Sequence, residues 1–172
     1  EFIDNSYKKV LTIFEEHFKK QPFLLGNFPS SCDFAVYGQF TQLVGFDPTP
    51  RRIAHEVSPR TVAWVSTLED RGGLNYSEEN KSLDSLSDSI HDLFKELATS
   101  YIPTMIENHK AINEVKEEWS VDLAGYPWKQ KSFPYQAKCL DWIRDEFKKL
   151  DTENQEKVLN FLTATNCQSL VE

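Results

Sequence analysis

The stretch from Pro22 to Phe40 constrains the fold of this chain more than any other. Gly26 suits the end of a helix, and Ser30, which directly follows a proline, has Asp33 three positions after it. A serine and an acidic residue at this spacing form a capping box, in which each side chain accepts a hydrogen bond from the backbone N–H of the other residue. The pattern therefore predicts a helix over residues 31–45 whose first turn is capped by Ser30 and Asp33.

Apolar side chains surround this predicted helix almost completely. They are Phe34, Ala35, Val36, Tyr37, Phe40, Leu43 and Val44. A helix that is apolar on most sides is buried rather than half-exposed. We therefore expect the helix over 31–45 to lie in the middle of a helical bundle.

Most of the remaining sequence is also helical in pattern. Apolar residues at helical spacing predict helices over residues 3–20, 50–57, 59–68, 83–112, 134–149 and 152–165. Proline disrupts a helix interior, so Pro103 should interrupt the long helix. The polar stretch 71–82 predicts a loop, and Thr152 with Gln155 matches a capping box for the last helix. The helix over 134–149 is expected to face inward with Tyr135, Cys139, Trp142, Ile143 and Phe147.

The segment near 115–131 departs from the helical spacing. Its apolar and polar residues alternate, which is typical of strands, and Ala124 with Gly125 can form a tight turn between two of them. An isolated hairpin is marginally stable in water, so this one should pack its aromatic face on helices. The predicted fold class is all-α, a helical bundle with a small β-hairpin insertion.

This pattern suggests how the chain is organised. We expect residues 1–112 to form a helical domain, and residues 113–172 to add the hairpin and two helices to the same core. Because the chain begins at Glu1 rather than methionine, we expect it to be part of a longer protein.

Composition bears on the partners of the chain. A formal net charge of −8 provides no basic surface for nucleic acid or for an anionic membrane, and no apolar run approaches the ~18 residues of a membrane span. We therefore expect neither nucleic acid nor a membrane as a partner. The three cysteines are widely separated, which indicates free thiols in a reducing compartment.

Residues that could suggest catalysis or metal binding have simpler interpretations. We expect Glu15, Glu16 and His17 to lie on a solvated helix face. The other three histidines are scattered and do not have the spacing of metal ligands. We therefore expect no metal site. A triad of Ser30, Asp33 and His17 is not inferred, because capping already accounts for the serine and the aspartate.

Longer sequence strings resemble one family. Residues 23–26 read Phe-Leu-Leu-Gly, and residues 29–38 contain Pro-Ser, then Asp-Phe-Ala, then Tyr-Gly; Asp47, Pro48 and Pro50 follow, and then Pro59, Trp64 and Val65. This series resembles the C-terminal all-helical domain of the glutathione S-transferase superfamily. The string from Tyr135 to Trp142 resembles an extension found in a bacterial subgroup of transferase-like proteins.

The resemblance implies a function for a larger protein. In that family a thioredoxin-like N-terminal domain binds and activates glutathione, and this chain lacks such a domain. The resemblance therefore implies a C-terminal portion of a cytoplasmic, homodimeric glutathione transferase that conjugates or reduces electrophiles. On its own the chain is expected to be inactive. It would supply the hydrophobic-substrate side, where Tyr37 and Thr41 are the candidate binding residues, and glutathione would be a substrate of the intact protein.

A second hypothesis is a binding module without catalysis. Transferase-like helical domains also serve as assembly scaffolds. In that case residues 83–172, which lie beyond the best resemblance, would provide the partner surface.

Overall fold

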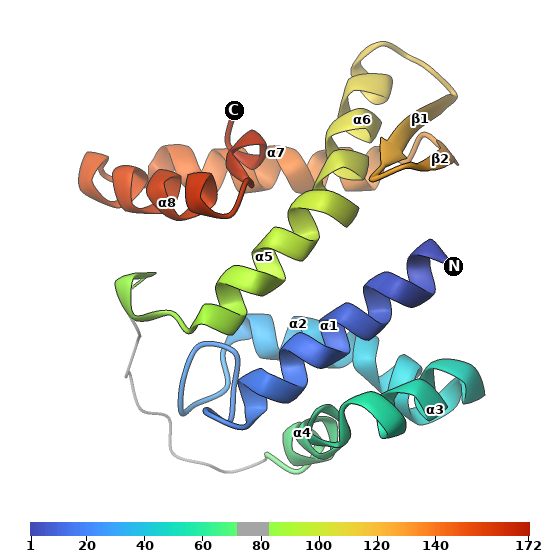
Figure 1. The fold of residues 1–172 in the computed structure, drawn as a ribbon. Coiled ribbons are helices and arrows are strands. Elements are labelled where there is room, and N and C mark those ends of the chain that lie inside the picture. Colours follow the sequence, from blue (N-terminus) through green and yellow to red (C-terminus); the bar gives the residue numbers. More distant parts are fainter. Residues whose placement is uncertain (72–82) are drawn as a thin grey trace. The chain divides into compact units, whose positions relative to one another are not determined.

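The computed structural model describes residues 1–71 and 83–172 (Figure 1). Within these residues the chain is mainly helical and contains one antiparallel hairpin, which confirms the predicted fold class. The predicted loop over 71–82 lies outside the described residues from position 72 onward. The chain divides into two compact units, residues 1–93 and residues 94–172. The domain division after residue 112 is a different boundary, and it stays a prediction.

The first unit is built from helices. Its elements are α1 (Phe2–Phe18), α2 (Ser31–Phe40), a π-helical turn η1 (Thr41–Phe46), α3 (Pro48–Val57), α4 (Pro59–Glu69), a 3-10 turn (Leu83–Ser85) and the beginning of α5 (Asp88–Ser100). Ser58 caps α4 by accepting from the Thr61 N–H, and Pro59 follows in the first turn. Proline suits that position because the first-turn N–H has no intrahelical partner.

Aromatic rings form the centre of the first unit. The rings of Phe18 and Trp64 stack with centroids 5.0 Å apart, and those of Phe14 and Phe40 are 5.5 Å apart. These rings come from α1, α2 and α4, so one aromatic cluster joins three helices. Burying a side chain of this size contributes about 1.5–3 kcal/mol, which makes the cluster a major source of stability for the unit.

The central position expected for the helix over 31–45 is wrong. Only Asp33 and Phe40 of α2 are buried, and Phe34 is 50% exposed. The helix packs on α4 and on η1 through one side, which leaves its other apolar side in contact with solvent. The α-helix also ends at Phe40, and the chain continues to Phe46 as a π-helix.

The second unit combines the hairpin with helices. Its elements after α5 are α6 (Ile102–Asn113), β1 (Glu118–Leu123), β2 (Tyr126–Lys131), α7 (Pro134–Lys149), α8 (Thr152–Ala164) and a 3-10 turn η3 (Gln168–Leu170). The predicted interruption is confirmed, because α5 ends at Ser100 and α6 begins at Ile102, directly before Pro103. The single helical pattern over residues 83–112 thus corresponds to two helices, α5 and α6.

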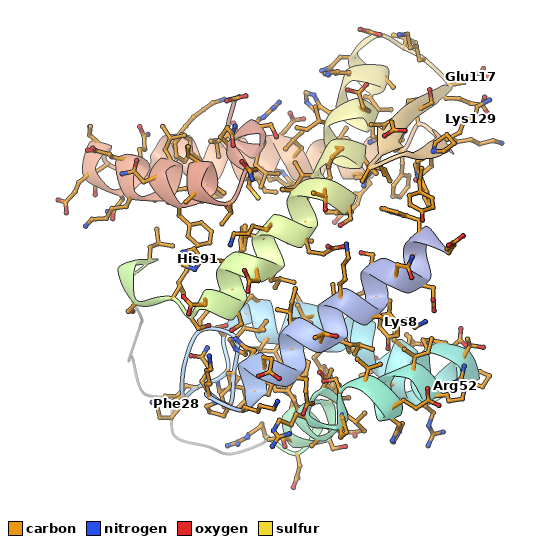
Figure 2. The ribbon with its side chains drawn as sticks, in the orientation of Figure 1. Lys8, Phe28, Arg52, His91, Glu117 and Lys129 are labelled. Atoms are coloured by element: carbon orange, nitrogen blue, oxygen red, sulfur yellow. The ribbon has the colours of Figure 1, made fainter. Side chains whose placement is uncertain are left out.

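The predicted hairpin is confirmed together with its turn. The strands pair in register from Glu118 with Lys131 to Leu123 with Tyr126. Ala124 and Gly125 both have positive φ, at 53° and 90°, as a tight two-residue hairpin turn requires. The side chain of Lys129 lies at the surface of the hairpin (Figure 2) and its ammonium is 2.6 Å from a carboxylate oxygen of Glu118.

Two expectations for the last helices are wrong. The buried residues of α7 are Ala137 and Leu140, whereas Tyr135, Trp142 and Ile143 are exposed. This helix packs mainly on α6, and its aromatic side points outward. The cap of α8 is Asp151, whose carboxylate accepts from the Asn154 N–H at 2.9 Å, rather than the predicted threonine.

One buried side chain connects the parts of the second unit. Asn108 on α6 is fully buried, and its amide oxygen accepts from the Trp119 indole N–H at 3.1 Å and from the Phe133 N–H at 2.8 Å. Its amide nitrogen donates to the Phe133 carbonyl at 2.9 Å. Asn108 thereby attaches both the hairpin and the start of α7 to α6.

We expect Asn108→Ala to destabilise the chain by about 2–4 kcal/mol, because buried donors and an acceptor would lose their partners. Urea unfolding followed by tryptophan fluorescence measures the change. Asn113→Ala, which removes an exposed asparagine from the same helix, is the matched control and should cost less than about 0.5 kcal/mol. Equal losses in the two variants would contradict the role of Asn108.

Candidate functional site

The start of α2 is organised around the carboxylate of Asp33, which is fully buried. One of its oxygens accepts from the Leu24 N–H at 2.8 Å. The other accepts from the Ser30 N–H at 2.9 Å and from the Ser30 hydroxyl at 2.6 Å. Ser30 and Asp33 form a capping box, and the bond to Leu24 also fixes the preceding loop. All these partners belong to the protein, which makes the role of Asp33 structural.

Cys32 lies between the two capping residues. Its sulfur is 2.9 Å from the Ser30 hydroxyl oxygen. Burial raises the pKa of the Cys32 thiol, and the charge of Asp33 acts in the same direction, although the hydrogen bond with Ser30 opposes them. A raised pKa disfavours the thiolate, which is the nucleophilic form of cysteine. The raised pKa therefore gives no support to a nucleophilic role for this thiol.

The solvated position expected for His17 is wrong, because this side chain is only 1% exposed. Its Nε2 lies 3.1 Å from the Phe23 carbonyl oxygen, and its Nδ1 lies 2.8 Å from the Ser89 hydroxyl. The side-chain nitrogen of Gln21 also lies 3.0 Å from Nε2, so this ring nitrogen contacts both a backbone carbonyl and an amide. His17 thus joins α1 to the loop before α2 and to the start of α5. Its partner Ser89 is 72 positions away, so helical periodicity alone could not reveal it.

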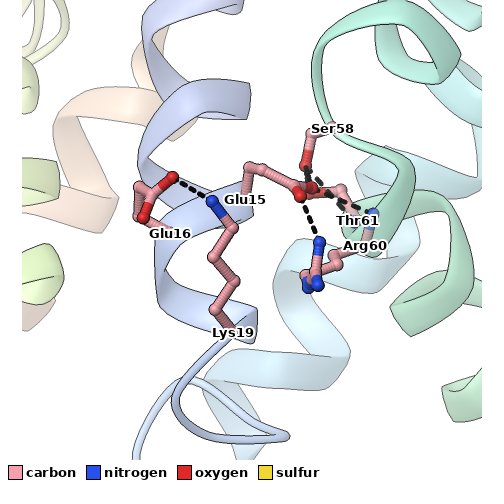
Figure 3. Close-up of polar contacts among 6 residues, drawn as sticks. All are labelled: Glu15, Glu16, Lys19, Ser58, Arg60 and Thr61. Carbon is pink, nitrogen blue, oxygen red and sulfur yellow. Dashed lines mark hydrogen bonds and ion pairs between the residues drawn. The ribbon is translucent and has the colours of Figure 1, made fainter.

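Glu15, the acidic neighbour on the same helix, connects α1 to α4 (Figure 3). Its carboxylate accepts from the Arg60 guanidinium at 2.6 Å, from the Arg60 N–H at 3.0 Å and from the Ser58 hydroxyl at 3.1 Å. Burial alone would raise the pKa of Glu15, but the hydrogen bonds from Arg60 and Ser58 and the charge of Arg60 outweigh it. The pKa of Glu15 therefore lies below its ordinary value.

Tyr37 and Thr41, the candidate substrate residues, lie one turn apart at the end of α2. Both are half-buried, and the Thr41 hydroxyl donates to the Gly38 carbonyl at 2.9 Å. The spacing of Phe34, Tyr37 and Thr41 places the three side chains on one face of the helix. Thr41 also begins the π-helical turn, a rare conformation that is frequent at functional sites. This face of α2 combines apolar surface with two hydroxyl groups.

Neither a metal centre nor a membrane span is found among residues 1–71 and 83–172. No group of three or more potential metal-binding side chains lies close together there. None of the helices in the same ranges combines the length and apolarity that crossing a bilayer requires.

We expect Asp33→Ala to destabilise the chain by about 2–4 kcal/mol, since two backbone N–H groups would lose their acceptor. Ser30→Ala should cost about 1 kcal/mol, the usual cost of a lost cap. Asp47→Ala is the control, because Asp47 is an exposed cap whose carboxylate accepts from the Thr49 N–H. Thermal unfolding measures all three. A loss for Asp33→Ala no larger than for Asp47→Ala would show that Asp33 is an ordinary cap.

Glu15 predicts a pH dependence of stability. Because its pKa is lower in the folded chain, the ionised carboxylate stabilises the fold above its ordinary pKa, and this contribution is lost as the pH falls below about 5. Glu15→Gln should destabilise the chain by about 1–2 kcal/mol at pH 7 and flatten the dependence between pH 5 and pH 3. Urea unfolding at several pH values measures this.

The matched control for Glu15→Gln is Glu16→Gln. Glu16 is the next residue and forms an exposed ion pair with Lys19 (Figure 3). Exposed pairs contribute little, so this variant should keep the pH dependence of the original chain. The same flattening in both variants would contradict the assignment to Glu15.

Comparison with known proteins finds a similarity within the first unit. The sequence profile described as "Glutathione S-transferase, C-terminal domain" matches residues 5–71, which contain α1, the capping box and α4. No curated protein and no solved structure matches the chain. The resemblance noted from the capping motif is therefore confirmed over this range. Over residues 5–71 the chain is similar to the glutathione S-transferase C-terminal domain.

Proposed function

We propose that this chain is the C-terminal portion of a glutathione S-transferase-like protein. The intact protein conjugates electrophiles with glutathione or uses glutathione to reduce them. The observation that carries this proposal is the family match over residues 5–71. The capping network of Ser30 and Asp33, which lies within that range, supports it.

In this proposal the chain supplies the hydrophobic-substrate side of the active site. The face of α2 that bears Phe34, Tyr37 and Thr41 contacts the electrophile, because it combines apolar surface with hydroxyl groups that can orient a polar substituent. A thioredoxin-like domain in the same polypeptide binds glutathione and activates its thiol. The chain of 172 residues alone is then inactive.

The proposal extends to the state of the intact protein in the cell. Similarity to the transferase family over residues 5–71 supports a homodimer. A cytoplasmic location fits the three cysteines, which are free thiols in the structure. The extension typical of a bacterial transferase-like subgroup is proposed for the residues after 112.

The experiment compares the intact protein with the 172-residue chain. The intact protein should be retained on immobilised glutathione and should conjugate 1-chloro-2,4-dinitrobenzene, whereas the chain alone should do neither. An intact protein that neither binds the resin nor turns over this or other generic electrophiles would overturn the proposal.

Variants of the intact protein test the substrate residues. Tyr37→Phe and Thr41→Val each remove a hydroxyl that can hydrogen-bond the electrophile. Loss of that hydrogen bond should lower kcat/KM for the electrophile about tenfold. The KM for glutathione should stay unchanged. The matched controls are Tyr101→Phe and Thr67→Val, which remove the same hydroxyl groups from exposed residues of other elements. Equal effects in candidates and controls, or a change confined to KM for glutathione, would contradict the assignment.

A second candidate function is a non-catalytic interaction scaffold. It is favoured by residues 83–172, which lie outside the family match and include exposed aromatic side chains on α7. The sequence preceding this chain in its gene discriminates between the two functions. A strand-helix-strand pattern with Tyr, Ser or Cys at its first turn supports the transferase, and its absence supports the scaffold.

A further inference from the structure

The outer face of α7 carries a stripe of exposed side chains. Its members are Tyr135, Lys138, Trp142, Glu146 and Lys149, and every one of them is exposed. Successive members are three or four positions apart, which places them on one side of the helix. Tyr135 and Trp142 are 58% and 47% exposed, although rings of this size are usually buried. We call this set the α7 stripe.

The rings at the centre of the α7 stripe contact one another. Those of Tyr135 and Trp142 meet edge to face with centroids 6.0 Å apart, and the Lys138 ammonium lies 5.0 Å from the centre of the Trp142 ring. Toward the end of the helix, Lys149 pairs with Glu146 at 2.6 Å. Aromatic residues at the centre with charges around them are the usual composition of a protein interface.

The charges of the α7 stripe are complementary to a second copy of the same stripe. Lys138 and Glu146 lie four residues before and after Trp142, and Tyr135 and Lys149 lie seven before and after it. When two identical helices pair antiparallel about a two-fold axis through Trp142, each residue faces the one at the same distance on the other side. Lys138 then faces Glu146 of the second copy, an attractive pair.

The other positions agree with this arrangement. Tyr135 faces Lys149 of the second copy, which allows a cation–π contact, and the two Trp142 rings meet at the axis. A parallel pairing would instead place Lys138 against Lys138 and Glu146 against Glu146, and both contacts are repulsive. The charge order therefore favours the antiparallel pair over the parallel one.

We propose that the α7 stripe is a self-association surface through which two copies of this chain pair antiparallel. The surface lies outside residues 5–71, so the proposal does not depend on the transferase function. One pair of 16-residue helices is small beside the roughly 800 Å² per partner of a standard stable interface. The expected dimer is therefore weak and depends on concentration.

Sedimentation velocity of the 172-residue chain, from about 1 μM to about 1 mM, measures the association. The chain should change from monomer to dimer as the concentration rises. Trp142→Glu should abolish the dimer, because it places two carboxylates at the axis. Lys138→Glu and Glu146→Lys should each weaken the dimer about tenfold, since each variant puts like charges opposite each other twice.

Restoration of the charge pair makes the test specific. The double variant Lys138→Glu/Glu146→Lys should dimerise as the original chain does, and an equimolar mixture of the two single variants should form heterodimers. The two positions are eight residues apart, which is too far for direct contact on one helix, so rescue reports pairing between copies. Lys148→Glu is the control, because it makes the same charge change about 120° away from the stripe.

Three results would overturn the proposal. These are a monomer at every concentration, a dimer that persists in Trp142→Glu, and single charge variants that the double variant does not rescue. All the substituted side chains are exposed, so the variants should fold, and circular dichroism with thermal unfolding checks this.

Discussion

The first unit depends on the burial of a single carboxylate, that of Asp33. An ionised side chain removed from water requires several hydrogen bonds, and here they come from Ser30 and from the Leu24 N–H. These donors belong to the loop that precedes α2 and to the start of the helix itself. The hydrogen bonds of this one carboxylate thus fix the start of α2 and the position of the loop that precedes it.

Both units contain a buried polar side chain with several hydrogen-bond partners. In the second unit, Asn108 binds backbone and side-chain groups of segments that lie 11 and 25 positions further along the chain. In both cases a buried polar residue with several partners joins an irregular segment to a helix. Apolar packing is tolerant of small shifts, whereas hydrogen bonds of this kind are directional, so such residues fix the position of loops that a core alone would leave undefined.

Sequence reasoning identified the parts of the fold that local signals specify. The cap at Ser30 and Asp33, the break near Pro103 and the hairpin turn at Ala124 each follow from residues within a few positions of one another. The buried position of His17 was missed, because its partner Ser89 on α5 is 72 positions away. The inward face of α7 was also predicted wrongly. Apolar residues occupy two sides of that helix, and tertiary packing, mainly with α6, decides which side is buried.

Buried polar groups and open helix faces differ in whether they can bind a ligand. The buried polar groups at Asp33 and Asn108 already bind protein partners, so they have little capacity left for a ligand. The capacity for recognition lies instead on the faces that packing leaves open. On α2, Gly38 has no atom within 4 Å of where a Cβ would stand, yet glycine within a helix costs about 1 kcal/mol relative to alanine. Contacts within residues 1–71 and 83–172 therefore do not require glycine at this position of α2.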